Sequence, residues 1–187
     1  MKRSPVQMLV EAGIMIGLAY VLNLFKIYQL PQGGSVTAGS MIPILVFALR
    51  WGVKPGLMAG LAFGLLQMAM GGYVIHPAQA ALDYPLAFAA LGLAGLFSKQ
   101  VVNNVNTDAT KAIVNAVIGV SLAVIVRFVC HVLSGVIFFS EYAGEMNPWL
   151  YSGIYNGSFL SVELILSAVL IAFVTVPVMK AVKPVAQ

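Results

Sequence analysis

Long hydrophobic stretches, separated by short polar segments, run through the entire chain. Six of them have the length and composition of membrane helices, and we place these at residues 6–25, 36–50, 54–71, 79–98, 110–138 and 156–181. A helix needs about 20 apolar residues to cross a bilayer. The second stretch is short for this, which predicts a tilted helix or one that begins within the outer leaflet. The pattern predicts an all-α integral membrane protein, in which residues 1–187 form a single six-helix transmembrane domain.

The composition supports this interpretation. Apolar residues make up 60% of the chain and charged residues only 9%, and the mean hydropathy is +0.96. Soluble domains have about 45–50% apolar and about 25% charged residues. Too few polar side chains are present to cover a water-soluble surface, so the composition predicts a protein that is embedded in the lipid bilayer.

The basic residues indicate the topology of the predicted bundle. Lys26 falls on one side and Arg127 lies inside the fifth span, whereas the other basic residues share the opposite side: Lys2, Arg3, Arg50, Lys54, Lys99, Lys111, Lys180 and Lys183. An excess of Lys and Arg marks cytoplasmic loops. The pattern therefore predicts cytoplasmic N- and C-termini and an even number of spans. Because this asymmetry explains the sequence pI of about 9.3, we expect no nucleic-acid partner.

Polar and aromatic residues gather at the predicted outer ends of spans three to six. Insertion of a polar side chain into the bilayer costs a few kcal/mol, so each such residue within a span is expected to have a structural or functional role. The residues concerned are Tyr73, Asp83, Tyr84, His131, Gly135, Tyr151 and Asn156. One carboxylate, one imidazole, one amide and several rings at one depth predict an outward-facing cavity. Such a cavity suits a small aromatic or heteroaromatic cation.

Simpler interpretations of the same residues stay open. Asp83 alone is also compatible with an N-cap, and His131 with a hydrogen bond to a neighbouring helix. The aromatic residues Tyr142, Trp149 and Tyr155 are typical of the belt at a membrane interface. The functional interpretation depends on convergence at one depth, which none of these alternatives predicts.

Three further ionisable residues lie inside the spans. Arg127 and Glu163 occur at comparable depth in the fifth and sixth spans, which predicts a buried ion pair. Glu11 in the first span has no partner that the sequence indicates. An alternative function uses Asp83, His131, Arg127 or Glu163 for proton coupling in a stand-alone secondary carrier.

Gly13 and Gly17 form a stripe of small residues on the first span. Small residues at a spacing of four let another helix approach closely. The stripe is compatible with packing inside the bundle and equally with docking of a separate membrane partner.

The sequence offers little support for catalysis. It contains no GxxxxGK[ST] phosphate-binding loop, no HExxH and no GxSxG. Ser134 lies three residues from His131, but nothing places a third catalytic residue or an oxyanion hole. We therefore expect a protein that is not an enzyme, with an intramembrane hydrolase as a remote alternative.

Several segments resemble the thiamin-specific S component of energy-coupling factor (ECF) transporters. The resemblance spans nearly the whole chain and is carried by PQGGS at 31–35, IP at 42–43, ALRWG at 48–52, GGY at 71–73, HP at 76–77, DYPLAF at 83–88, HxxxG at 131–135, and Tyr151 with NG at 156–157. It implies a six-helix subunit of the bacterial plasma membrane that binds thiamin from outside with high affinity. It also implies two kinds of partner, a transmembrane T component and two cytoplasmic ATPases.

The resemblance assigns roles to individual residues. It implies a thiamin-binding pocket lined by Tyr73, Asp83, Tyr84, His131, Gly135, Phe139, Tyr151 and Asn156, with Gly13 and Gly17 as the partner-docking stripe. Thiamin is then the cargo, and no cofactor or metal is expected. The nearest alternative is the same architecture with another vitamin or a thiamin precursor as cargo.

The chain departs from the family pattern at three positions. Asp83 is one methylene shorter than the glutamate that is common there, and Phe139 stands where some members carry tryptophan. The outer loop near Gly34 lacks a tryptophan that some members have. We expect the loop at 26–35 to close over the ligand.

Overall fold

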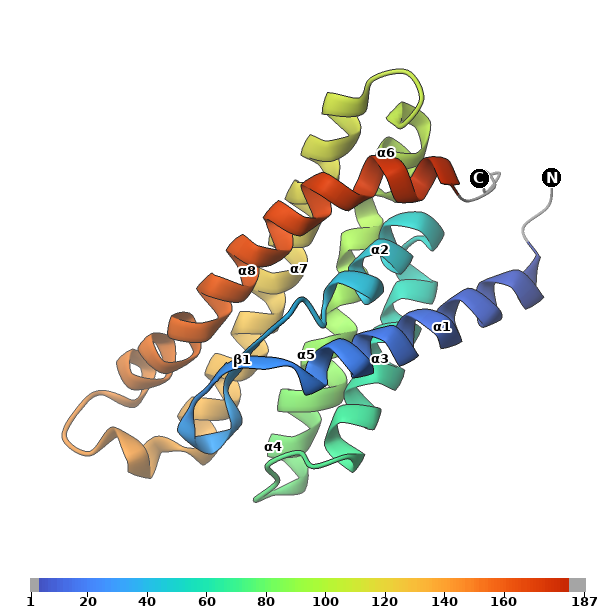
Figure 1. Ribbon diagram of the computed structural model, residues 1–187. Coiled ribbons are helices and arrows are strands. Elements are labelled where there is room, and N and C mark those ends of the chain that lie inside the picture. Colours follow the sequence, from blue (N-terminus) through green and yellow to red (C-terminus); the bar gives the residue numbers. More distant parts are fainter. Residues whose placement is uncertain (1–3, 182–187) are drawn as a thin grey trace.

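The computed structural model describes residues 4–181 and shows a bundle of apolar helices (Figure 1). Its main helices are α1 (Pro5–Leu24), α2 (Ile42–Trp51), α3 (Val53–Ala69), α7 (Ala109–Phe138) and α8 (Pro148–Ala181). Between α3 and α7 runs one continuous helical segment, made of α4 (Pro77–Ala81), η2 (Leu82–Leu86), α5 (Ala87–Ala89), η3 (Ala90–Phe97) and α6 (Ser98–Asn104). Short 3₁₀ turns occur at η1 (Pro31–Gly33) and η4 (Ser140–Ala143).

Four of these helical segments are long and apolar enough to cross a membrane. They are Pro5–Leu24, Pro77–Asn104, Ala109–Phe138 and Pro148–Ala181, while α2 and α3 are shorter apolar helices of 10 and 17 residues. The predicted all-α membrane protein is therefore confirmed. The count of six crossings and the side of the termini stay predictions. Of the basic residues behind the second prediction, Lys2, Arg3 and Lys183 lie outside the described residues.

Three predicted span boundaries are wrong. The fourth helical segment ends at Asn104 rather than at 98. The second span does not begin at residue 36, because residues 35–37 form a strand and α2 begins at Ile42. The last span begins at Pro148 rather than 156. Asn147 caps this helix, since its side-chain oxygen accepts the N–H of Trp149 at 2.9 Å and of Leu150 at 3.4 Å. Proline in the first turn is compatible with a helix because its missing N–H would have no partner there.

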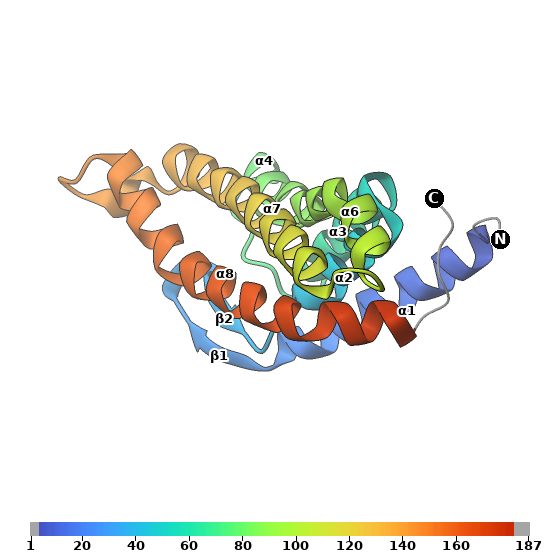
Figure 2. The ribbon, with the colours of Figure 1, turned by 90° about the horizontal axis from the view of Figure 1, so that it is seen from above.

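A short antiparallel hairpin joins α1 to α2 and was not predicted. Strand β1 (Lys26–Gln29) pairs with β2 (Ser35–Thr37), with Lys26 opposite Thr37 and Gln29 opposite Ser35. The turn between them uses left-handed backbone at Gln32 and Gly33, with φ of 60° and 97°. Figure 2 shows the hairpin beside α8, on the other end of the molecule from the start of α1 and the end of α8.

Helix α3 packs very closely against the continuous helical segment that follows it. Gly56, Gly60 and Gly64 are buried at a spacing of four. A Cβ at Gly56 would lie 2.9 Å from the Cα of Gly92, and one at Gly64 would lie 2.9 Å from the Cα of Pro85. Only glycine permits this backbone approach. The packing fixes α3 against the segment that carries Asp83.

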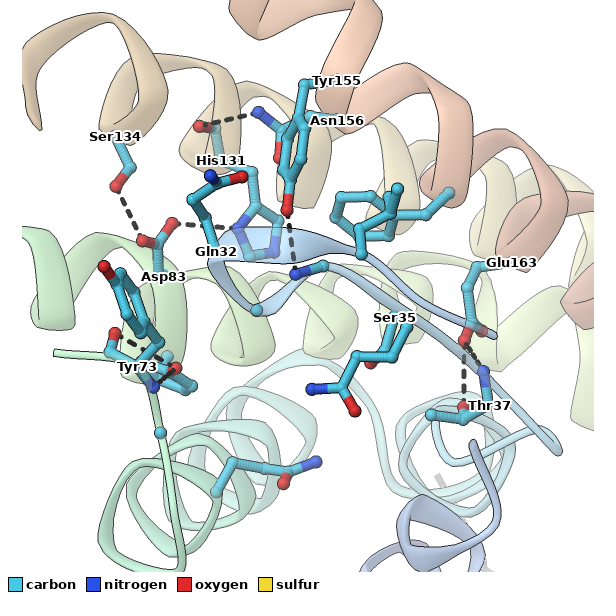
Figure 3. A pocket seen from close by; sticks show the side chains of 18 of the residues that line it. Gln32, Ser35, Thr37, Tyr73, Asp83, His131, Ser134, Tyr155, Asn156 and Glu163 are labelled. Carbon is cyan, nitrogen blue, oxygen red and sulfur yellow. Dashed lines mark hydrogen bonds and ion pairs between the residues drawn. The ribbon is translucent and has the colours of Figure 1, made fainter. Parts of the chain in front are cut away.

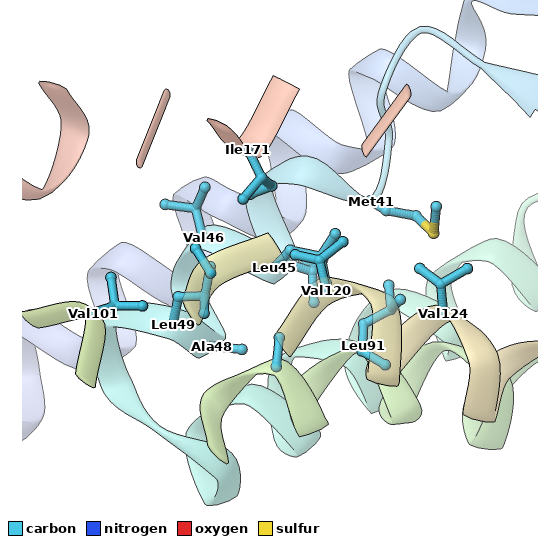
Figure 4. Close-up of a cluster of buried hydrophobic side chains, with 14 of the residues drawn as sticks. Met41, Leu45, Val46, Ala48, Leu49, Leu91, Val101, Val120, Val124 and Ile171 are labelled. Atoms are coloured by element: carbon cyan, nitrogen blue, oxygen red, sulfur yellow. The ribbon is translucent and has the colours of Figure 1, made fainter. Parts of the chain in front are cut away.

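Helix α2 lies at the centre of the apolar core. Met41, which precedes it, and Leu45 and Leu49 within it are fully buried and pack with Leu91 of η3 and Val120 of α7 (Figure 4). Helix α7 packs extensively against both η3 and α8. This core holds the helices that surround the cavity described below.

A buried ionic contact joins α1 to α2 and provides the partner of Glu11. The Glu11 carboxylate accepts hydrogen bonds from Arg50 Nε at 2.8 Å and from Trp51 Nε1 at 2.6 Å. Arg50 and Trp51 are 4% and 1% exposed. Arg50, one of the basic residues placed on the cytoplasmic side above, is thus balanced by Glu11, and Trp51 packs against α1.

Candidate ligand-binding cavity

A cavity of about 830 Å³ lies between the hairpin and the ends of α1, α3, η2, α7 and α8. Small-molecule pockets typically enclose about 300–1,000 Å³. All eight residues predicted to form a binding site line this one cavity: Tyr73, Asp83, Tyr84, His131, Gly135, Phe139, Tyr151 and Asn156. They come from separate helices and loops, and Figure 3 shows Tyr73, Asp83, His131 and Asn156 around the same space.

Asp83 is the carboxylate at one end of the cavity. Its Oδ1 lies 3.0 Å from His131 Nδ1, and its Oδ2 accepts a hydrogen bond from Ser134 Oγ at 2.8 Å (Figure 3). Oδ2 also accepts a hydrogen bond from Gln79 Nε2 at 2.7 Å. Asp83 is not an N-cap, because α4 begins earlier and its cap is His76, whose Nδ1 accepts the N–H of Ala78. The capping alternative is therefore wrong.

The π-helical turn η2 presents neighbouring side chains to the same cavity. Asp83 and Tyr84 are consecutive, yet both line it. A π-helical turn is rare and is frequently found at functional sites. Tyr84 Oη accepts the N–H of Tyr73 at 2.5 Å, so it also holds the loop after α3.

The hydrogen bonds of His131 define its tautomer. Arg127 Nε lies 3.3 Å from His131 Nε2, and an arginine can only donate. Nε2 is therefore the acceptor, and the ring proton is on Nδ1, which donates to Asp83 Oδ1. His131 is neutral in this arrangement. The interpretation of His131 as a residue that bonds a neighbouring helix is compatible with this contact, and the ring also lines the cavity.

Asn156 stands on α8 opposite Asp83. Its Nδ2 donates to His131 O at 3.3 Å and to Ser152 O at 3.0 Å. Within the described residues its amide oxygen accepts no hydrogen bond, which leaves it available to a ligand donor. Gly135 permits this geometry, because a Cβ there would lie 3.0 Å from the Cβ of Ser152 and 3.4 Å from Asn156 Nδ2.

Aromatic rings form two walls of the cavity. Tyr73 and Phe139 lie on one side, with ring centroids 6.1 Å apart. Tyr151 and Tyr155 stack on the other side, with ring centroids 6.2 Å apart. Phe159 makes a T-shaped contact with Tyr155. Both walls line the cavity along with Asp83. A flat cationic ring between such walls gains stacking and cation–π contacts.

The hairpin is fastened to α8 at two points. Tyr155 Oη accepts the N–H of Gly34 at 3.1 Å and donates to the carbonyl of Pro31. Glu163 Oε1 accepts the N–H and the hydroxyl of Thr37, at 2.6 and 2.9 Å (Figure 3). The hairpin therefore covers part of the cavity in this structure.

The predicted Arg127–Glu163 ion pair is wrong. Within residues 4–181 the two side chains form no salt bridge, although both are buried. Glu163 Oε1 instead accepts a hydrogen bond from Thr37 of the hairpin. Its Oε2 has no hydrogen-bond partner in the described part of the chain. The Arg127 guanidinium lies 4.3 Å from the centre of the Phe88 ring and bonds His131. The unpredicted hairpin supplies the donors that change the pairing.

The geometry around Ser134 argues against a hydrolase. Ser134 donates to Asp83 rather than to His131, and the proton of His131 Nδ1 is also directed at Asp83. A serine nucleophile needs histidine as its base. Ser134 is instead a support for the carboxylate.

The small-residue stripe of α1 faces away from the rest of the chain. A Cβ at Gly13 or Gly17 would have no atom within 4 Å. Packing of these glycines inside the bundle is therefore excluded for the described residues. The face is open to lipid or to a partner.

Sequence reasoning missed three residues that shape the cavity: Gln79, Thr37 and Ser152. Gln79 lies four residues before Asp83, and this spacing is the available signal, because residues four apart meet on a helix. Thr37 and Ser152 make their contacts to residues far along the chain or on another helix, so no local pattern identifies them.

The fold and this cavity define the class: a multi-pass membrane protein with a cavity that is lined by polar and aromatic side chains. The family model described as "Thiamine transporter protein" matches residues 9–183. The chain belongs to this family.

Individual relatives agree with this assignment. The thiamine transporter ThiT of Bacillus subtilis (strain 168) is 39% identical over 176 residues, which cover 90% of this chain and 91% of the relative. ThiT of Lacticaseibacillus paracasei is 34% identical, over 70% of this chain and 68% of that protein. The solved structure of ThiT from Listeria monocytogenes is 30% identical and superposes with a TM-score of 0.85, over 93% of this chain and 97% of that one.

A second solved structure shows the same fold at greater distance. It is the S-component for biotin from an ECF-type ABC transporter, with a TM-score of 0.61 and 19% identity, over 94% of this chain and 92% of that chain. At this identity the likeness supports the fold alone.

Proposed function

We propose that this chain is the high-affinity thiamin-binding subunit of an ATP-driven uptake transporter of the ECF class. The observation that carries the proposal is the convergence of Asp83, His131, Asn156 and two aromatic walls on one cavity. Family membership and the names of the relatives agree with thiamin as the solute. The ECF class is part of the proposal, and the chain shares its fold with the S-component for biotin of such a transporter.

Thiamin matches the chemistry of the cavity. It carries a permanent positive charge on its thiazolium ring and hydrogen-bond donors on its aminopyrimidine. The aromatic walls stack on such rings, and the carboxylate of Asp83 balances the charge or accepts from the amino group. The amide oxygen of Asn156 provides a second acceptor. Recognition therefore requires no metal or cofactor, and thiamin is the cargo.

Partners supply the energy for transport. The chain holds no GxxxxGK[ST] loop, so ATP hydrolysis by that mechanism falls to two cytoplasmic ATPases. A transmembrane T component docks on the open face of α1 at Gly13 and Gly17. Helix α1 also lines the cavity through Tyr20 and Asn23 and leads directly into β1. Docking and ligand binding therefore occur on one helix.

The hairpin acts as the closing loop. Residues 26–35 lie over the cavity, and Tyr155 and Glu163 fasten the hairpin to α8. Thiamin enters when these contacts open and is held when they reform. Inward release follows reorientation of the subunit by its partners.

Substitution of Asp83 tests the proposal. In Asp83→Asn, binding of cationic thiamin falls about tenfold or more, since a charge-assisted contact is worth about 1.5–3 kcal/mol, while binding of a neutral thiamin analogue falls less. Isothermal titration of the purified protein in detergent measures both. Asp108→Asn is the matched control, because Asp108 caps α7 and does not line the cavity. Equal losses for both ligands contradict a charge-balancing role.

Two assays separate the remaining alternatives. Competition with thiamin precursors and other vitamins shows which cargo binds most tightly. Vesicles that contain this chain alone show whether a pH gradient drives uptake without ATPases. Uptake under those conditions favours a proton-coupled carrier and contradicts the proposed dependence on partners.

A further inference from the structure

Gln79 is almost completely buried beside the binding cavity, and both the nitrogen and the oxygen of its amide form hydrogen bonds. It is 1% exposed. Its Nε2 donates to Asp83 Oδ2 at 2.7 Å and to the carbonyl of Tyr73 at 3.1 Å, and its Oε1 accepts the N–H of Ile75 at 3.1 Å. Both acceptors need the NH₂ group and the backbone donor needs the oxygen, so these partners define the orientation of the amide.

The contacts of Gln79 join two parts of the site that are separate in sequence. One part is the loop after α3, which carries Tyr73 of the aromatic wall. The other is the π-helical turn, which carries Asp83. Tyr84 adds a second connection, because its hydroxyl accepts the N–H of Tyr73. The loop and the carboxylate are therefore held as one unit.

A carboxylate offers about four lone-pair positions. At Asp83, Oδ2 already accepts from Gln79 and Ser134, and Oδ1 accepts from His131. One position remains, on Oδ1. A carboxylate fixed in this way meets its ligand in a single orientation, which reduces the entropy lost on binding.

We propose that Gln79 is a positioning residue for ligand binding: it fixes Asp83 with Oδ1 available to the ligand and holds Tyr73 in the facing wall. It does not itself need to contact the ligand. The proposal rests on the proposed thiamin-binding function and extends it to a residue outside the predicted site.

The first test replaces the amide by an apolar side chain of similar length. Gln79→Met leaves Asp83 Oδ2 with Ser134 alone and removes some of the contacts that hold the loop after α3, so thiamin binding weakens about tenfold. Gln100→Met, on α6 and away from the cavity, changes it less than about twofold. Titration calorimetry measures both. Similar affinities for the two folded variants overturn the proposal.

The second test uses the pH profile of Gln79→Glu, expressed relative to wild type. The new carboxyl group donates to Asp83 only when it is protonated. Relative thiamin affinity therefore falls as the pH rises and the new group loses its proton. A purely electrostatic effect has the opposite sign, because an added negative charge attracts the cation. A flat or rising profile overturns the proposal, and this test decides the matter if Gln79→Met does not fold.

A third readout is independent of thiamin. Hydrogen exchange of the Ile75 amide in the ligand-free protein rises in Gln79→Met and not in Gln100→Met, since Gln79 accepts that N–H. Unchanged exchange overturns the positioning role. If exchange rises but wild-type protein binds no thiamin, the proposed function fails while the connection through Gln79 stands.

Discussion

Helices α1 and α3 both carry glycines at a spacing of four, and the structure uses the two stripes in opposite ways. Gly56, Gly60 and Gly64 of α3 are buried against backbone atoms of the following helical segment. On α1, a Cβ added at Gly13 or Gly17 would meet nothing within 4 Å. The same sequence pattern therefore serves internal packing in one helix and leaves an open face in the other. The surroundings of the motif, and not its spacing, decide its role.

The neighbouring residues follow the same division. Large apolar side chains of α1, such as Leu9, Ile14 and Val21, are 65%, 62% and 50% exposed. The α3 stripe instead adjoins Phe63, which is fully buried and packs edge-on against Phe88. The α3 region is thus a fixed wall of the cavity, whereas α1 contacts the rest of the chain along one side.

The largest expected effect comes from filling the buried stripe. Gly60→Leu forces side-chain atoms into the backbone of Phe88 and Ala89, which costs about 3 kcal/mol or more of folding free energy. We expect a strongly lowered unfolding temperature in detergent or loss of folded protein. Thermal unfolding measures this. A stable Gly60→Leu variant contradicts the close packing of α3.

Filling the open stripe has a different outcome. Gly13→Leu spares folding and thiamin binding, but it weakens assembly with the T component and ATPases about tenfold or more, because the added side chain blocks close helix approach. Co-purification of the complex measures assembly. Gly153→Leu is the matched control, since Gly153 on α8 also has nothing within 4 Å. If Gly13→Leu assembles normally and binds thiamin poorly, α1 is not the docking face.

A smaller effect is expected where the hairpin is fastened to α8. Glu163→Ala removes the acceptor of the Thr37 N–H and hydroxyl, so the hairpin opens more often. Thiamin then dissociates about five- to tenfold faster, with little change in association. Stopped-flow displacement measures the rates. Glu145→Ala, in the exposed loop before α8, is the control. Unchanged dissociation shows that the hairpin does not retain the ligand.

Hydropathy predicted most of the fold, because a segment that spans the lipid must form its backbone hydrogen bonds internally and therefore becomes a helix. It missed the hairpin, whose strands of four and three residues are too short for a periodic signal. It also placed the start of the last helix eight residues late, with Tyr151 and Asn156 at the outer entry to the span. The signal for the earlier start was Asn147 followed by Pro148, which is a cap before a favourable first residue.

The site was predictable in its residue types and depth but not in its contacts. Polar groups within spans are costly, so Asp83, His131 and Asn156 were conspicuous. Which groups pair depends on side-chain geometry that no spacing encodes, so the Arg127–Glu163 pairing was wrong and the contact of Glu163 with Thr37 was missed. Gln79 was missed because it is the first residue of a predicted span, where a polar side chain is not unusual.

The most direct test of the account is thiamin binding by the purified wild-type chain without its partners. We expect titration calorimetry to show one thiamin per chain with a dissociation constant at or below the micromolar range, and mass spectrometry to find thiamin in gently purified protein. In the same measurement, we expect Asp83→Asn to remain folded and to bind thiamin about tenfold or more weakly. Absence of any binding heat at micromolar thiamin, in protein that is folded, contradicts the proposed function.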